Sequence, residues 1–126
     1  VGNPHCVRFV GDFDFDWRAV GAAVEHHPLF PNRTNVQFVT VEDRIDARIW
    51  ERGAGETQAS GSSSCAVAVA TVFTGQRPAG AHTIHMPGGT LLVEVERSDE
   101  GYPVVLTGPV ELVCRIELVP GWLAAR

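Results

Sequence analysis

The chain has 126 residues, 44% of them hydrophobic, and ten basic against fifteen acidic residues give a net charge of −5. This length suffices for one globular domain, and an acidic balance without a basic stripe argues against nucleic-acid binding. Cys6, Cys65 and Cys114 are widely spaced, which predicts buried free thiols in a reducing compartment and neither a disulfide framework nor a zinc site. No signal peptide or membrane-length apolar run is apparent, so we expect a cytoplasmic protein that binds a small molecule.

Short strands are predicted on both sides of one central helix. A β-rich alternation over 6–10 predicts the first strand, and residues 12–25 have the apolar spacing of a short amphipathic surface helix. Pro87, Gly88 and Gly89 between two alternating stretches are typical of a hairpin turn. The remaining predicted strands cover 34–41, 44–50, 82–86, 90–96, 104–107 and 110–119.

The central helix is predicted over residues 62–73. The alternation of Val67 and Val69 also fits a strand, but alanines on the intervening positions favour a helix. Ser62 is typical of a helix start, and Gly75 is typical of a helix end.

No charged residue occurs between Glu56 and Arg77, so the central helix has no polar face to offer water. The prediction is therefore an α+β domain in which an antiparallel-rich mixed sheet wraps around one buried helix, with almost no solvent exposure for that helix.

The start of this helix is a candidate anion site. Unpaired backbone N–H groups and the positive end of the helix dipole favour a carboxylate or phosphate there. Gly53, Gly55 and Gly61 precede or begin the helix and allow tight turns and close ligand approach. A serine-capped helix that binds nothing is the alternative.

Acid–base candidates are few. His5, Glu51 and Glu56 have suitable side chains, although solvated loop charge is their commoner role. His82 and His85 are three residues apart on a predicted strand, which directs them to opposite faces, so no shared metal is expected.

Several short motifs occur in an order that resembles the second half of the diaminopimelate epimerase family. They are Gly2-Asn3-Pro4-His5, Pro31-Asn32-Arg33-Thr34-Asn35-Val36, Glu51-Arg52-Gly53-Ala54-Gly55-Glu56-Thr57, Pro87-Gly88-Gly89 and Leu106-Thr107-Gly108-Pro109. The resemblance covers residues 1–126, which it identifies as a single domain similar to the C-terminal domain of a two-domain enzyme. The resemblance implies that the N-terminal domain of such an enzyme is missing from this chain.

The resemblance implies an isomerase that works without a cofactor. Members of this family convert LL- to meso-diaminopimelate, a step of lysine and peptidoglycan-precursor biosynthesis, in a cleft between two similar α+β halves. One cysteine from each half flanks the α-carbon: one thiolate removes the proton, and the other thiol returns a proton from the opposite face. The expected partners are an amino-acid substrate and the missing first half. Alone, the chain should be inactive, and its uncovered apolar face should promote homodimers.

The resemblance also implies roles for individual residues. It identifies Asn3 and Asn35 as substrate-binding amides, Glu51 and Arg52 as the pair that grips the distal end of the substrate, and His5 as the histidine beside the catalytic centre. Gly61 and Ser62 occupy the step whose backbone amides receive the α-carboxylate. The candidate catalytic residues are Ser60, His5 and Glu51.

Ser60 departs from the family pattern. Where the family has Ala-Cys-Gly-Thr-Gly-Ala, this chain has Ala59-Ser60-Gly61-Ser62-Ser63-Ser64, so Ser60 stands at the position of the catalytic cysteine. A serine hydroxyl needs a neighbouring base to react, whereas a thiol at a helix start supplies thiolate near neutral pH. Cys65 should be packed inside one turn later and cannot replace that thiol.

Three functions therefore stay open. The chain is half of an epimerase or racemase, half of an isomerase that uses a carboxylate such as Glu51 or Glu56, or part of a non-catalytic amino-acid-binding protein. Because Ser63 and Ser64 accompany Ser60, a natural divergent branch explains the change better than an engineered one.

Overall fold

The computed structural model describes residues 2–119 and 121–122. No helix in this part of the chain is long and apolar enough to cross a membrane. In chain order the elements are β1 (His5–Phe9), α1 (Trp17–Glu25), β2 (Asn35–Val41), β3 (Ile45–Glu51), β4 (Gly55–Thr57), α2 (Gly61–Phe73), β5 (Gly80–Met86), β6 (Gly89–Val95) and β7 (Val104–Thr107).

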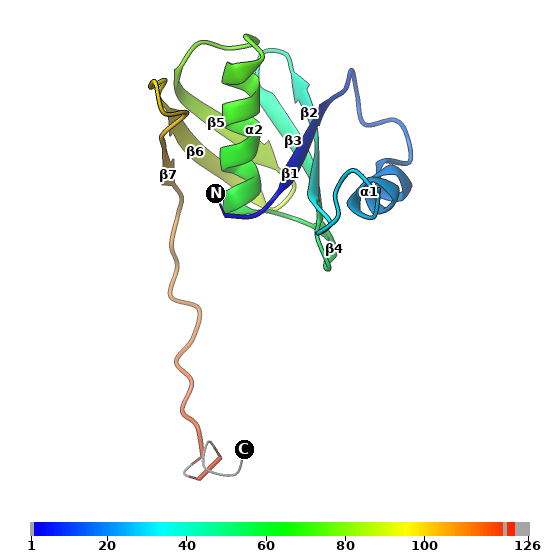
Figure 1. The fold of residues 1–126 in the computed structure, drawn as a ribbon. Coiled ribbons are helices and arrows are strands. Elements are labelled where there is room, and N and C mark those ends of the chain that lie inside the picture. The colour runs from blue at the N-terminus through cyan, green and yellow to red at the C-terminus, as the bar shows by residue number, and fades with distance from the viewer. Residues whose placement is uncertain (1, 120, 123–126) are drawn as a thin grey trace.

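The strands form one sheet in the order β1-β2-β3-β5-β6-β7, with β4 paired to β3. The β1–β2 and β3–β5 pairs are parallel, and the other pairs are antiparallel. The sheet curls around α2, and α1 lies on its outer side (Figure 1). The predicted α+β fold with an antiparallel-rich sheet around a central helix is confirmed.

Strand β2 is the inner layer between the two helices. Its side chains alternate, as a pleated strand requires: Val36 and Phe38 pack with Trp17 of α1, whereas Val39 joins the core around α2. All three β2 residues are buried. This double burial explains why both faces of the strand carry apolar residues.

Helix α1 starts at Trp17, later than the stretch 12–25 predicted for it. Asp16 is the reason, because its carboxylate accepts a hydrogen bond from the Ala19 amide at 3.1 Å and caps the helix. A Cβ atom at Gly21 would lie 2.8 Å from Trp50 Cβ, so the glycine allows α1 to approach β3 closely.

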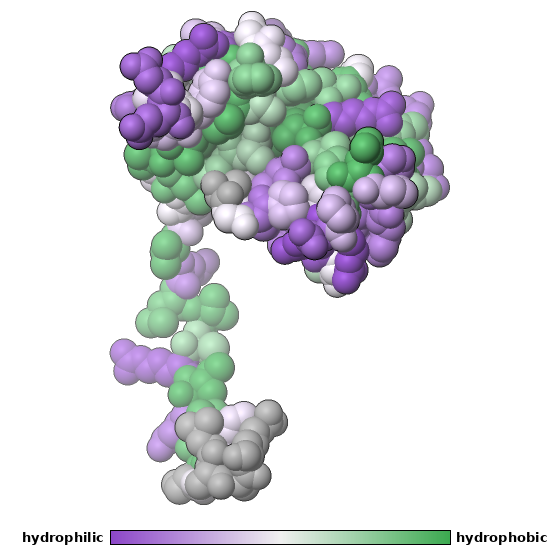
Figure 2. Space-filling view, in the orientation of Figure 1, coloured by the Kyte–Doolittle hydropathy of each residue, from purple (hydrophilic) through white to green (hydrophobic). Residues whose placement is uncertain are grey.

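The predicted central helix is confirmed as α2, and strands from both flanks cover it. The predicted near-complete burial is wrong. Phe73 is 69% exposed and Ala66 and Val69 are half-buried, because the sheet leaves an open seam between β1 and β7. An apolar groove of about 600 Å³ follows this seam, and Figure 2 shows apolar side chains along it.

The strand predicted over 110–119 is also wrong. These residues leave the domain as an extended tail without strand structure, and Val110 is 97% exposed (Figure 1). Alternation produces a strand only where a neighbouring edge supplies hydrogen bonds. Cys114 lies on this tail and is exposed, contrary to the expectation of a buried thiol, whereas Cys65 is buried as predicted.

Candidate functional site

The start of α2 is a serine-lined helix terminus. Ser60 has an extended backbone and caps the helix, since its Oγ accepts a hydrogen bond from the Ser63 amide at 3.4 Å. The Ser60 carbonyl oxygen accepts from the Ser64 amide at 3.0 Å and from the Ser64 hydroxyl at 2.9 Å. The N–H groups of Gly61 and Ser62 have no intrahelical acceptor at this position in a helix. They can therefore bind a carboxylate.

A chain of hydrogen bonds connects this helix start to β1. The Gln37 side-chain amide donates to Ser63 Oγ at 3.0 Å and lies 3.0 Å from His5 Nδ1. His5 Nε2 lies 3.2 Å from Asn3 Oδ1. With Gln37 as donor, His5 is neutral and carries its proton on Nε2, which donates to Asn3.

Burial lowers the pKa of His5 below its ordinary value of 6.5. The charges of Glu51 and Arg52 also act on the His5 ring, with opposite signs. His5 is thus a neutral imidazole at pH 7, within electrostatic reach of two other predicted site residues.

Sequence reasoning missed Gln37. It is fully buried, and its Oε1 atom has no hydrogen-bond partner among the described residues. A buried polar atom without a partner is costly, so Gln37 Oε1 marks a position at this end of α2 where the hydrogen bonding among the described residues is incomplete. The available signal was one amide in the otherwise apolar run from Val36 to Val39.

Asn35 joins two parts of the predicted site. Its Nδ2 donates to the Pro4 carbonyl at 2.9 Å, and its Oδ1 accepts from the Arg52 amide at 2.9 Å. The side chain is buried and its Oδ1 is engaged with the backbone. In this structure Asn35 holds the Asn3–His5 segment beside the Arg52 turn.

Arg52 lies at the edge of a second, more polar hollow of about 890 Å³. The guanidinium donates to the Asn32 carbonyl at 3.0 Å and is otherwise exposed. Arg33 lines the same hollow, so two cationic side chains border it. This is a suitable environment for a second carboxylate.

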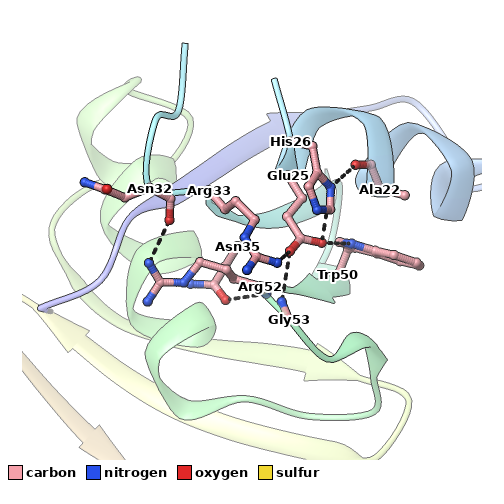
Figure 3. Close-up of polar contacts among 9 residues, drawn as sticks. All are labelled: Ala22, Glu25, His26, Asn32, Arg33, Asn35, Trp50, Arg52 and Gly53. Atoms are coloured by element: carbon pink, nitrogen blue, oxygen red, sulfur yellow. Dashed lines mark hydrogen bonds and ion pairs between the residues drawn. The ribbon is translucent and has the colours of Figure 1, made fainter. Parts of the chain in front are cut away.

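A buried carboxylate, that of Glu25, lies beside the Arg52 turn (Figure 3). Glu25, the last residue of α1, accepts hydrogen bonds from the Trp50 indole at 2.8 Å, the Gly53 amide at 2.9 Å and the Arg33 guanidinium at 3.3 Å. Sequence analysis overlooked Glu25, because a glutamate at the end of an amphipathic helix ordinarily faces water.

The structure brings most of the predicted site residues together. Hydrogen bonds or side-chain electrostatics link Asn3, His5, Asn35, Glu51 and Arg52, and the network through Gln37 and Ser63 reaches Ser60. Glu56 is engaged elsewhere: its two oxygens accept from Arg18 of α1 at 2.5 and 2.8 Å. Among the described residues, no group of three or more histidine, cysteine or acidic side chains is arranged to hold a metal.

Comparison with known proteins shows the family to which this chain belongs. The family model described as diaminopimelate epimerase matches residues 1–113. The chain belongs to the diaminopimelate epimerase family. It is 46% identical over 116 residues to the diaminopimelate epimerase of Acaryochloris marina, covering 90% of this chain and 40% of that protein. It is 48% identical over 118 residues to the enzyme of Moorella thermoacetica, covering 91% and 41%.

Solved structures show the same fold at low sequence identity. A predicted epimerase from Pseudomonas aeruginosa matches 83% of this chain and 36% of its own, with a TM-score of 0.65 and 16% identity. A phenazine biosynthesis protein of the PhzF family from Enterococcus faecalis matches 98% and 44%, with a TM-score of 0.62 and 21% identity. This member of the diaminopimelate epimerase family spans about 40% of the length of the curated relatives named above.

Proposed function

We propose that this chain forms the second half of a cofactor-independent diaminopimelate epimerase site. The start of α2, with the free amides of Gly61 and Ser62, would receive the α-carboxylate of the substrate. Arg52 and Glu51 would bind its distal amino-acid end. The observation that carries the proposal is that Asn35 and the Asn3–His5 segment join these two places in one network.

The start of β1 and the end of β7 both lie near the start of α2. This arrangement supports the proposal that a first half completes a cleft there. Gly61 lies close to Leu106 at the end of β7, since a Cβ atom on this glycine would be 3.0 Å from Leu106 Cδ2. The start of β1 reaches the same end of α2 through His5 and Gln37 (Figure 1). A first half linked to either end would therefore face the helix start. The single-domain assignment of residues 1–126 is part of this proposal.

Ser60 decides which chemistry the cleft performs. An epimerase needs one group to remove the α-proton and another to return a proton on the opposite face. The Ser60 hydroxyl caps α2 and has Ser62 Oγ at 3.5 Å, and no hydrogen bond links it directly to His5 or Glu51 among the described residues. Without a base the hydroxyl is a poor proton acceptor, so Ser60 alone does not replace a thiolate.

The capping contact of Ser60 favours a second candidate function. A protein that keeps the carboxylate site but does not exchange the α-proton would retain this geometry, with Ser60 as a structural cap. The carboxylate-dependent isomerase rests on Glu51, because the Arg18 contacts occupy Glu56. The cytoplasmic location and the absence of a cofactor belong to the same proposal, supported by the family membership. Homodimer formation also belongs to it, supported by the open apolar groove beside Phe73.

The test is α-proton exchange in deuterated water with the complete two-half protein. The substrate is diaminopimelate, and both stereoisomers are followed. If the cleft needs only a thiol, Ser60→Cys places one at the positive end of α2, where its pKa falls. Exchange should then rise by about 10²- to 10⁴-fold, the usual contribution of a general acid–base group, provided that the first half supplies its own cysteine. Ser60→Ala is the control.

Three results would change this proposal. If the native protein already exchanges the proton and Ser60→Ala abolishes the exchange, an activated serine is at work. If the native and Ser60→Cys proteins bind diaminopimelate but neither exchanges it, the binding function replaces the epimerase. Turnover by the 126-residue chain alone would contradict the need for a first half.

A further inference from the structure

Glu25 is a carboxylate that substrate cannot touch. It is 3% exposed, and α1, β3 and the Arg52 turn surround it. Its Oε1 accepts from the Gly53 amide and from Arg33, and its Oε2 accepts from Trp50. Both oxygens therefore have partners within the protein.

The partners of Glu25 lie on both sides of the candidate binding residue Arg52. Gly53 follows Arg52 directly and has a φ of 78°, a left-handed conformation that suits glycine. The turn closes where the Ala54 amide donates to the Glu51 carbonyl at 3.0 Å. Arg52 is thus held at its own amide by Asn35 and at the next amide by Glu25.

Arg33 supports the same arrangement. It is the only non-glycine residue with positive φ in the described part of the chain, at 57°. This conformation costs free energy and persists only where the surrounding structure holds the residue in place. Its guanidinium, which pairs with Glu25, also borders the hollow beside Arg52.

The electrostatics show that Glu25 is charged when folded. Burial alone would raise the pKa of the carboxyl, but the hydrogen bonds from Trp50 and Gly53, with the nearby His26 and Arg33 side chains, outweigh burial and lower it. His26 Nδ1 lies 4.0 Å from Oε2. A charged acceptor makes stronger hydrogen bonds than a neutral one, so the Gly53 contact is a firm restraint.

We propose that Glu25 is a positioning residue, which sets the Arg52 turn so that the Arg52 side chain meets the distal end of the substrate. This inference rests on the proposed function, because it uses diaminopimelate as the ligand with two amino-acid ends. Glu25 acts through Gly53 and does not contact the ligand. Its loss should therefore weaken binding of the distal end and spare the α-carboxylate site at α2.

The experiment compares two ligands on the complete two-half protein by calorimetry. Diaminopimelate has two amino-acid ends, whereas 2-aminoheptanoate has the same carbon chain with only one. Glu25→Gln keeps the size but replaces one acceptor by a donor, so the amide must oppose either the Trp50 indole or the Gly53 amide. We expect the affinity for diaminopimelate to fall by about 10- to 100-fold, which is the usual contribution of hydrogen bonds between charged groups such as Arg52 and a carboxylate. The affinity for 2-aminoheptanoate should change little.

Arg18→Gln is the matched control. It removes another contact between α1 and the sheet, the pair with Glu56, and leaves the Arg52 turn untouched. If the Ser60→Cys protein turns over, Glu25→Gln in that background should raise KM and leave kcat nearly unchanged, since distal contacts are the same in the ground and transition states. A loss of folded protein alone would lower the apparent kcat instead.

A double variant distinguishes loss of the Gly53 contact from misfolding of the Glu25→Gln protein. Adding Trp50→Phe to Glu25→Gln removes the indole donor, so the remaining carbonyl oxygen can accept from Gly53. The double variant should bind diaminopimelate within about threefold of Trp50→Phe alone, because both proteins keep an acceptor for the Gly53 amide and lose no further hydrogen bond there. Failure to recover, in a folded double variant, would contradict a role for the Gly53 contact.

Hydrogen exchange of residues 51–55 separates this inference from the proposed function. Faster exchange in Glu25→Gln than in Arg18→Gln is expected, because the turn loses its restraint. If the native protein binds neither ligand, the proposed function fails, and the exchange rates still decide whether Glu25 sets the turn. Equal losses for both ligands, the same selective loss in Arg18→Gln, or unchanged exchange would overturn the inference.

Discussion

The α1 side and the α2 side of the sheet differ in how completely this chain satisfies them. On the α1 side, Trp17, Val36 and Phe38 are buried together, and the Glu25 carboxylate has a partner for each oxygen. On the α2 side, Phe73 is exposed and the Gln37 Oε1 atom has no partner among the described residues. The α1 side is closed, whereas the α2 side carries the larger buried core but is open along the seam between β1 and β7.

This difference indicates where a ligand and a first half would bind. A closed cluster gains nothing from a further partner, because its hydrogen bonds and apolar contacts are already made. An open helix start would gain hydrogen bonds from a bound ligand, and an apolar groove would gain apolar contacts from a first half. In this account the α1 side holds the binding residues in place, and the α2 side meets the substrate and the rest of the protein.

The two sides should therefore differ in how much stability depends on Phe38, which is buried on the closed side, and on Phe73, which is exposed at the open seam. Phe38→Ala in the 126-residue chain should lower the free energy of unfolding by about 3–5 kcal/mol, because it empties a buried site against Phe15 and Trp17. Phe73→Ala, at an exposed position, should cost less than about 1 kcal/mol. Urea unfolding of both variants measures the difference.

Equal losses in the two variants would break the comparison. They would mean that the open face of α2 is covered in solution. A dependence of the Phe73→Ala loss on protein concentration would then identify a second copy of the chain as the cover.

A smaller effect should distinguish the two sides by the pH at which each loses its contribution to folding stability. Folding lowers the pKa of His5 from 6.5 through burial, so the folded state binds fewer protons than the unfolded state below that pH. The stabilisation from neutral His5 is complete above pH 6.5 and is lost as the pH falls toward the folded pKa. Folding also lowers the pKa of Glu25 from 4.5, so its stabilisation is lost in a more acidic window.

Stability measured against pH checks these windows. His5→Gln should flatten the curve just below pH 6.5, and Glu25→Gln should flatten it below pH 4.5. Steeper loss in either variant than in the native chain, within its own window, would contradict the assigned direction.

Local patterns were sufficient to predict much of the fold. The serine cap, the alanine-rich run and the absence of charge between Glu56 and Arg77 identified α2 to within one residue of its start. Alternation located six of the strands. The same reasoning overestimated burial of α2 and predicted a strand over 110–119, since an apolar pattern does not reveal whether a partner surface is present in the same chain. Strand β4 was missed because three residues carry too little pattern.

The candidate-site residues that lie in sequence motifs were predicted. The residues whose position depends on tertiary packing were missed. Asn3, His5, Asn35 and Arg52 were identified from motifs, and the structure brings them together. Their functional roles stay predictions. Glu25 was not identified, because its burial depends on Gly21 admitting Trp50 and on the distant Gly53 amide. Such contacts join residues far apart in the chain, and no local spacing encodes them.

The most direct test of the central proposal follows the backbone amides at the start of α2. Diaminopimelate is titrated into the complete two-half protein labelled with ¹⁵N, which does not depend on whether Ser60 supports chemistry. We predict that the amide signals of Gly61 and Ser62 shift as the ligand saturates, because their free N–H groups receive its carboxylate. Saturable binding that leaves both signals unchanged would contradict the account.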